Sequence, residues 1–267
     1  MKSRNRNMNN QKVLYEELMP AEFVERINDC PIAYLPLGTL EWHGYHLPLG
    51  SDDLQSKGFF TELAKSIGGI VLPMLFLGPE VNVNKDGFDY VGIDHYSFED
   101  GYPQQLEGTA YYIEEELFVK VLEATLWNLS RAGFKIVVAH GHGPSNVTFG
   151  KCIEKFEKQF GLKLFELWDI GGTGNQGIQT DHAAFNETSL VLGLYPELAD
   201  MDRLQEDADM IGIWGLDPRG TASEEEGRTI ISNKVTVVGN RLKEELSKLK
   251  WAKREMKYSN MKKLYNE

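Results

Sequence analysis

The chain has 267 residues, 42% of them hydrophobic, which is enough for one large buried core. Its 28 basic and 40 acidic residues give a net charge of −12 that is spread along the chain, which argues against a surface that follows the phosphates of a nucleic acid. The two cysteines, Cys30 and Cys152, lie in different sequence contexts, so there is no disulfide framework and no CxxC motif. We expect both to be core residues of a reduced, cytoplasmic protein.

The N-terminal run MKSRNRNMNNQK is polar and lacks the apolar region of a secretory signal, so we expect residues 1–12 to form a disordered head. No later window holds the ~18 consecutive apolar residues of a membrane-spanning helix. The chain contains no repeat, no low-complexity tract and no clear linker. Residues 13–267 are therefore expected to form a single domain.

Short apolar runs alternate with amphipathic segments along the chain. The apolar runs predict buried strands at 32–38, 69–75, 135–139 and 162–168. The amphipathic segments predict helices at 54–67, 113–133, 147–160 and 231–249. The apolar positions that carry the pattern of the second helix are Ile113, Leu117, Val121 and Ala124. Residues 77–108, rich in glycine and aspartate, are expected to be irregular. The alternation indicates a layered α/β fold with a largely parallel sheet.

Two polar clusters follow directly after predicted strands. GTLEWHGYHLPLGSDD follows the first strand, and HGHGPSN follows the strand KIVVA. Because sites in open α/β sheets form beyond the carboxyl ends of the strands, the two loops are expected to face one crevice. Their candidate metal ligands are Glu41, His43, Asp52 and His142.

Carboxylate and imidazole donors in this mixture suit zinc, manganese or ferrous iron, and a carboxylate can bridge two ions. Glu41 and His43 are two residues apart, so in an extended chain both side chains leave on the same side. The alternative is that these residues only cap and turn the chain, with Asp52 or Asp53 at the start of the next helix.

A third cluster, in the segment TDHAAFNETS, contains Asp181, His182 and Glu187. His182 is a candidate proton carrier near neutral pH. In the alternative interpretation Asp181 and Glu187 are helix-start residues and His182 is a surface turn residue. Periodicity alone does not choose between the two.

The glycines of GGTGNQG fit the pattern G-x-G-x-x-G and follow a predicted strand, as in a dinucleotide-binding motif. The residues after them, IQTDHAAFNETS, are too polar at the start for the closely packed first helix of that motif. A flexible or site-lining loop is the favoured interpretation. The sequence contains no G-x-x-x-x-G-K-[ST] and no G-x-S-x-G, so it gives no support to a P-loop NTPase or a serine hydrolase.

Together the motifs resemble one known family. LGTLEWHGYHLPLGSD is similar to the signature G-x-x-E-x-H-G-x-H-L-P-x-x-x-D of the creatininase family of metal-dependent amidohydrolases. HGHGPSN resembles its NGHGGN loop, DHAAFNETSLVLGLYPEL its HAG-x-x-ETS-x-x-L segment, and LEGTAYY its PGT segment. Order and spacing hold from about Pro31 to beyond Asp202. The resemblance implies a three-layer α/β/α sandwich, in a single domain that often assembles into hexamers.

The resemblance also implies roles for individual residues. Glu41 and His43 would each hold one of two divalent metal ions, which Asp52 would bridge. His142 would bind the ion held by Glu41, and His182 matches the histidine assigned to proton transfer.

Some positions depart from the family pattern. Creatininase has a glutamate two residues after the loop histidine as a further ligand, and here that position is Pro144. Glu187 or water is the candidate replacement. The loop asparagine is His140, and one inserted residue displaces Asn146. Ile178 stands where creatininase packs its substrate against a tryptophan, so creatinine is not the expected substrate.

We therefore expect an amidohydrolase that cleaves the C–N amide bond of a small cyclic amide or formamide, with a hydroxide that bridges two metal ions as nucleophile. The expected partners are a small-molecule amide and further copies of the chain in a homo-oligomer such as a hexamer, and neither nucleic acid nor a membrane. Two alternatives stay open: a creatininase-fold binding protein whose metal site is incomplete because of Pro144, and a nucleotide-binding enzyme that uses GGTGNQG.

Overall fold

A computed structural model describes residues 12–98 and 104–255 of the chain. Apart from Lys12, the expected disordered head at 1–12 lies outside the described residues. None of the described helices is both long enough and apolar enough to cross a membrane.

Four parallel strands form the central sheet, in the order β2–β1–β5–β6. The two central strands, β1 (Ile32–Leu37) and β5 (Ile136–Gly141), pair along their whole length, and every residue in both is buried. The flanking strands are shorter, β2 (Ile70–Val71) and β6 (Lys163–Glu166). Continuous burial is what a parallel strand shows when both faces of its sheet are covered.

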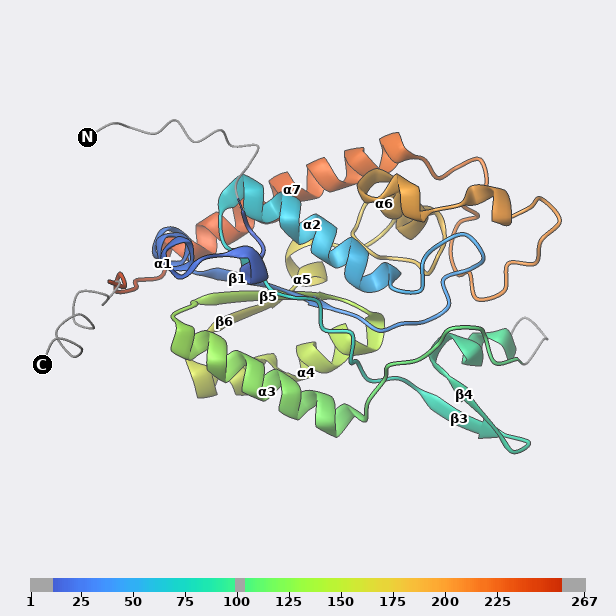
Figure 1. Ribbon diagram of the computed structural model, residues 1–267, viewed down its shortest axis with the longest axis horizontal. Coiled ribbons are helices and arrows are strands. Elements are labelled where there is room, and N and C mark those ends of the chain that lie inside the picture. The colour runs from blue at the N-terminus through green and yellow to red at the C-terminus, as the bar shows by residue number, and fades with distance from the viewer. Residues whose placement is uncertain (1–11, 99–103, 256–267) are drawn as a thin grey trace, which may run out of the picture.

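Helices cover both faces of this sheet (Figure 1). One face carries α2 (Ser51–Ile67), α6 (Phe185–Leu194) and α7 (Glu224–Ser247). The other face carries α3 (Glu115–Ala132) and α4 (Gly143–Phe160). Shorter helices are α1 (Pro20–Asp29) and α5 (Leu167–Gly171), with single 3₁₀ turns at Tyr15–Glu17, Pro196–Leu198 and Met201–Arg203.

Neighbouring residues of β1 belong to two separate hydrophobic cores. Ile32 and Tyr34 join the core under α2 and α7, whereas Ala33 and Leu35 join the core under α3 and α4. This alternation follows from the two-residue repeat of side-chain direction in a strand. The predicted three-layer α/β/α sandwich with a largely parallel sheet is thereby confirmed.

Two expectations for individual segments were wrong. Part of the segment 77–108 is ordered: β3 (Asn82–Lys85) and β4 (Phe88–Val91) pair as an antiparallel hairpin, and the 3₁₀ helix η3 (Gly92–Phe98) follows. The buried face of α3 is one position later than predicted, since Leu117 is 49% exposed. The residues on that buried face are Phe118, Leu122, Leu126 and Leu129. The predicted and the observed sets of positions both fit the helical period, and the set with more large apolar side chains is the buried one.

Glycines end both central strands and let the backbones approach closely. Gly141, at φ 150°, pairs with Leu37, and a Cβ atom at Gly141 would lie 1.4 Å from the carbonyl oxygen of Leu37. A Cβ atom at Gly38 would lie 2.1 Å from Oδ2 of Asp53, in the first turn of α2. The loops that follow β1 and β5 are thus held against each other and against the start of α2.

We predict that Gly141→Ala destabilises the fold by about 3 kcal/mol or more, because backbone atoms on a paired strand cannot yield to a methyl group. Gly150→Ala is the matched control. A Cβ atom there meets nothing within 4 Å, and alanine in a helix interior is favoured over glycine by up to ~1 kcal/mol. Urea unfolding of both variants measures the difference. A Gly141→Ala protein with the midpoint of the wild type would contradict the prediction.

Candidate metal centre

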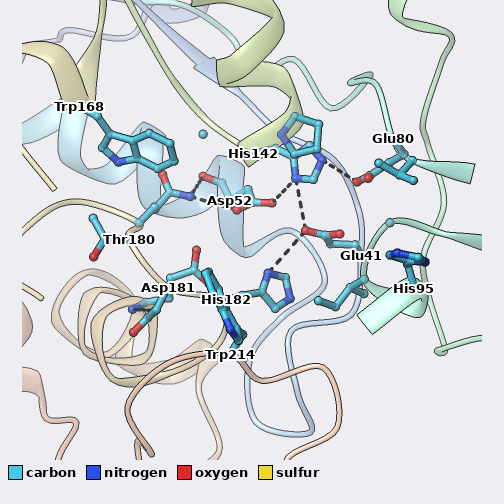
Figure 2. A pocket seen from close by; sticks show the side chains of 18 residues that line it. Glu41, Asp52, Glu80, His95, His142, Trp168, Thr180, Asp181, His182 and Trp214 are labelled. Carbon is cyan, nitrogen blue, oxygen red and sulfur yellow. Dashed lines mark hydrogen bonds and ion pairs between the residues drawn. The ribbon is translucent and has the colours of Figure 1, made fainter. Parts of the chain in front are cut away.

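The loops after β1 and β5 meet the first turns of α2 and α6 at the carboxyl edge of the sheet, where they form a cluster of buried polar side chains (Figure 2). All five metal ligands expected from the sequence lie in this cluster, and each is at most 5% exposed. These residues are Glu41, His43, Asp52, His142 and Glu187. The expectation that the two strand-end loops share one crevice is met by their placement.

Asp52 and Asp53 lie in the first turn of α2, but neither caps the helix, since Gly50 is the N-cap and makes no side-chain hydrogen bond. The partial positive charge of a helix N-terminus favours a carboxylate at this position. Asp181 does serve the start of a helix, because its carboxylate accepts hydrogen bonds from the backbone N–H groups of Asn186 and Glu187 at the start of α6. Glu187 also lies in that first turn, and its carboxylate accepts a hydrogen bond from the backbone N–H of Ala183 at 2.8 Å. The helix-start interpretation is therefore correct for Asp181 and Glu187, and it is wrong for Asp52 and Asp53 as caps.

One set of donor atoms joins the two loops. The Nδ1 atom of His142 lies 3.3 Å from Oε1 of Glu41 and 3.2 Å from Oδ2 of Asp52. Ligands about 2.1 Å from a shared zinc or similar ion are separated by roughly 3.0–3.4 Å. Both distances from Nδ1 therefore fit ligands of one divalent ion.

A second set uses the other oxygen of the same aspartate. The Nε2 atom of His43 lies 3.6 Å from Oδ1 of Asp52 and 3.7 Å from Oε2 of Glu187. The Nδ1 atom of His43 faces the carbonyl oxygen of Glu41 at 3.2 Å. Because a carbonyl can only accept, Nδ1 carries a proton there, and Nε2 faces the two carboxylates without a hydrogen-bond partner. That position requires a cation, either a proton or a metal ion.

The pKa values of the clustered side chains also indicate that the site favours positive charge. Burial alone would lower the pKa of His43, but the adjacent carboxylates, Asp52 foremost, outweigh it and raise the pKa to about 10. Burial raises the pKa of Glu41 to about 7. Burial would also raise the pKa of Asp52, but His43 and His142 hold it well below its usual range. The donors thus attract positive charge strongly, as a site for two divalent ions would.

His182 lies beside this centre. Its ring stacks on that of His43, with 4.3 Å between the centroids, and its Nε2 donates to the carbonyl oxygen of Trp42 at 2.8 Å. Burial, together with the His43 imidazole, lowers the pKa of His182 to about 3, so the ring is neutral near pH 7. With the proton on Nε2, the lone pair of Nδ1 faces Oε1 of Glu41 at 3.8 Å. An unprotonated nitrogen is therefore available at the site.

The donors form the floor of a cavity of about 260 Å³. The side chain of Ile178 is only 2% exposed and belongs to the core, so the position where creatininase has its tryptophan supplies no wall here. Trp168 lines the cavity instead, with its indole N–H donating to the carbonyl oxygen of Ile178 at 2.8 Å. Trp214 and His95 also line it (Figure 2). No Lys or Arg stands among the lining residues that the structure describes.

The loop GGTGNQG does not have the arrangement of a dinucleotide site. It follows α5 rather than a strand, and a further loop separates it from α6. Gln179 and Thr180, just after it, line the cavity, and the Gln179 amide donates to Oδ1 of Asp52 at 3.1 Å. The cavity is thus lined by the residues that follow the loop, and none of the loop's own residues is among its described lining.

Sequence reasoning missed Glu80, whose carboxylate oxygen Oε1 lies 2.5 Å from Nε2 of His142. The sequence predicts an irregular segment at 77–108 and names no metal ligand in it. A signal was present, because Glu80 follows the edge of the sheet next to β1: Leu75 bridges to Leu37 in parallel. The rule that strand ends carry sites applies to this third loop as well.

Comparison with known proteins gives the same fold and family. Residues 16–238 match the family model Creatininase, described as creatinine amidohydrolase. A creatinine amidohydrolase from Pseudomonas putida is 26% identical over 271 residues, which cover 88% of this chain and 98% of that protein. A crystal structure of creatinine amidohydrolase superposes with a TM-score of 0.68 at 22% identity, covering 88% of this chain and 98% of the other. A manganese form of creatininase superposes with a TM-score of 0.64 at 23% identity, covering 88% and 99%. Since the family model spans most of its length, the chain belongs to the creatininase family.

Proposed function

We propose that this chain is a hydrolase that uses two divalent ions, zinc, manganese or iron, to cleave the C–N amide bond of a small cyclic amide or formamide. The observation that carries the proposal is the position of Asp52. One of its oxygens lies 3.2 Å from Nδ1 of His142, which also faces Glu41, and the other oxygen lies beside His43, in a group with Glu187. When bound, two ions at these donors would supply an activated water and polarise the amide carbonyl.

The protein's own residues would divide the remaining work. Glu41 and His142 would hold one ion, His43 and Glu187 the other, and Asp52 both. His182 would take the proton from the attacking water at Nδ1 and pass it to the leaving nitrogen as the C–N bond breaks. The hydrogen bond from its Nε2 to the Trp42 carbonyl would keep that nitrogen directed at the reacting atoms.

The cavity supports a neutral substrate of small size. Its described lining contains no Lys or Arg to pair with a phosphate or carboxylate group of a substrate, and Trp168 offers a flat apolar face. We further propose a single domain over residues 13–267 in a cytoplasmic homo-oligomer, such as the hexamer implied by the family resemblance. The two thiols, Cys30 and Cys152, are free, which agrees with a reducing compartment.

Removing the shared carboxylate tests the metal centre. We predict about two ions per wild-type chain, none in Asp52→Ala, and about one in His43→Ala, which leaves the donors Glu41 and His142 in place. Elemental analysis of the purified proteins gives the count. The matched control is Asp53→Asn: burial and Asp52 raise the pKa of Asp53 to about 8, so the native side chain is already mostly neutral at pH 7.

The results also separate the alternatives. An Asp52→Ala protein that retains two ions would refute the shared-carboxylate assignment. One ion or none in the wild type would favour a binding protein with an incomplete metal site, and bound nucleotide would favour the nucleotide-binding enzyme.

Replacing His182 should affect metal content and activity differently from replacing a metal ligand. We predict that His182→Ala keeps its ions but loses ~10²–10⁴-fold in turnover of any active substrate, the usual contribution of general acid–base catalysis. His142→Ala should lose ion content and activity together. The measurement is metal content beside turnover for both variants. Loss of metal from His182→Ala would make it a ligand, which its distance to Glu41 and His43 permits.

Creatinine turnover by the metal-loaded protein is predicted to be absent or far weaker than in a true creatininase assayed beside it. The reason is that Ile178 points into the core, so a flat ring would have Trp168 as a stacking partner but no second aromatic face from that position. The side chain of Tyr96 lies outside the described residues. Robust creatinine hydrolysis would show that other aromatic side chains complete the wall.

A further inference from the structure

Glu80 is a buried carboxylate to which the proposed reaction assigns no role. Its side chain is 2% exposed. Among the residues that the structure describes, His142 is the one that forms an ion pair with it. Gly92 makes room for the carboxyl group: at φ 58°, a Cβ atom there would lie 2.9 Å from Cδ and Oε2 of Glu80. The segment around the hairpin β3–β4 is thus shaped to hold this carboxylate against the imidazole.

The two ring nitrogens of His142 face different partners (Figure 2). Nδ1 faces Glu41 and Asp52, the donors of the first set, and Nε2 faces Glu80 at 2.5 Å. If Nδ1 gives its lone pair to an ion, Nε2 must carry the proton of the neutral imidazole. The Glu80 carboxylate is in ion-pair contact with Nε2, and a negative charge there favours the tautomer that carries its proton on Nε2.

Glu80 is a different carboxylate from the ligand that Pro144 replaces. Pro144 lies in the first turn of α4, two residues after His142, and contributes no side-chain oxygen. Glu187, the candidate replacement, lies on the other side of Asp52 with His43. Glu41 and Asp52 face Nδ1 of His142, and the carboxylate that faces Nε2 comes from Glu80, in a loop that follows a different strand.

We propose that Glu80 is a positioning residue for the metal centre: it holds His142 through Nε2 so that Nδ1 is presented to the ion shared with Glu41 and Asp52. This inference rests on the proposed two-ion site. The Glu80 carboxylate also lies within ligand range of Glu41 and His142, but its contact with Nε2 places it against the imidazole, so in this proposal it acts through the ring and not on the ion. Carboxylates in this relation to a ligating histidine typically contribute ~10–100-fold to metal affinity.

Zinc affinity of the full chain tests the proposal, measured by competition of metal-depleted protein with a zinc-chelating dye. We expect Glu80→Ala to weaken the binding of one ion by ~10–100-fold, and Glu80→Gln, whose amide oxygen still accepts from Nε2, to weaken it less. Asp89→Asn is the matched control, since it removes one negative charge from an exposed position of the same hairpin. It should bind zinc as the wild type does.

A double-mutant cycle separates positioning from direct ligation. In a His142→Ala background, Glu80→Ala should change zinc affinity by no more than about twofold, because a residue that acts through the imidazole then has nothing to act on. A further large loss in that background would make Glu80 a direct ligand and overturn the inference. Wild-type affinity in the single Glu80→Ala variant would overturn it too. A wild-type protein that binds no zinc would instead overturn the two-ion site itself.

Discussion

The structure depends on a concentration of negative charge held away from water. The carboxylates of Glu41, Asp52 and Glu187 lie together, with side chains at most 7% exposed, and the groups that face them are imidazoles. An uncompensated charge at such depth costs several kcal/mol, and breaking one buried ion pair costs about 3–5 kcal/mol. The folded state therefore requires cations between these donors. If the cations are metal ions, part of the free energy of ion binding becomes free energy of folding.

Helices and paired strands of the surrounding fold hold these charged side chains in place. Asp52 lies on a helix of 17 residues that packs on the sheet, and Glu187 lies on α6. Glu41 and His142 follow central strands that pair along six residues and end at glycines. Donors supported by helices and paired strands are held more accurately than donors on free loops. The arrangement suits a centre in which the separation of ligands decides which ion binds.

Much of this could be predicted from the sequence, for reasons that differ between elements. β1 and β5 are continuous apolar runs, and the donors stand directly beyond them, so the rule for strand ends was sufficient to group Glu41 and His142. α6 was not predicted, because its apolar residues surround the helix and give no stripe; seven of its ten residues are buried. Periodicity could not choose between Leu117 and Phe118 in α3, since either stripe fits the helical repeat.

Glu80 illustrates a different difficulty. β2 has only two residues, and the apolar run beyond it continues as an irregular chain interrupted by Pro73, Gly78 and Pro79. The contact between Glu80 and His142 joins residues 62 positions apart and depends on the path of that irregular chain. Local propensity contains no information about such a contact. Sequence reasoning therefore succeeds for donors directly beyond a strongly apolar strand, such as Glu41 and His142, and it missed Glu80, which follows a strand of only two residues.

The cavity is lined by residues from the central α/β layers and by residues from the segment around the hairpin. Trp168 is held at two points, since its backbone N–H donates to Glu166 and its indole N–H to the Ile178 carbonyl. The facing wall includes Val81, Ile93 and His95 from the hairpin and the 3₁₀ helix after it. Substrate selection is therefore partly modular. Remodelling the segment beyond Glu80 would change which amides fit the cavity, while the metal-ligand side chains stayed in place. Chains that share one reaction chemistry can therefore differ in their substrates.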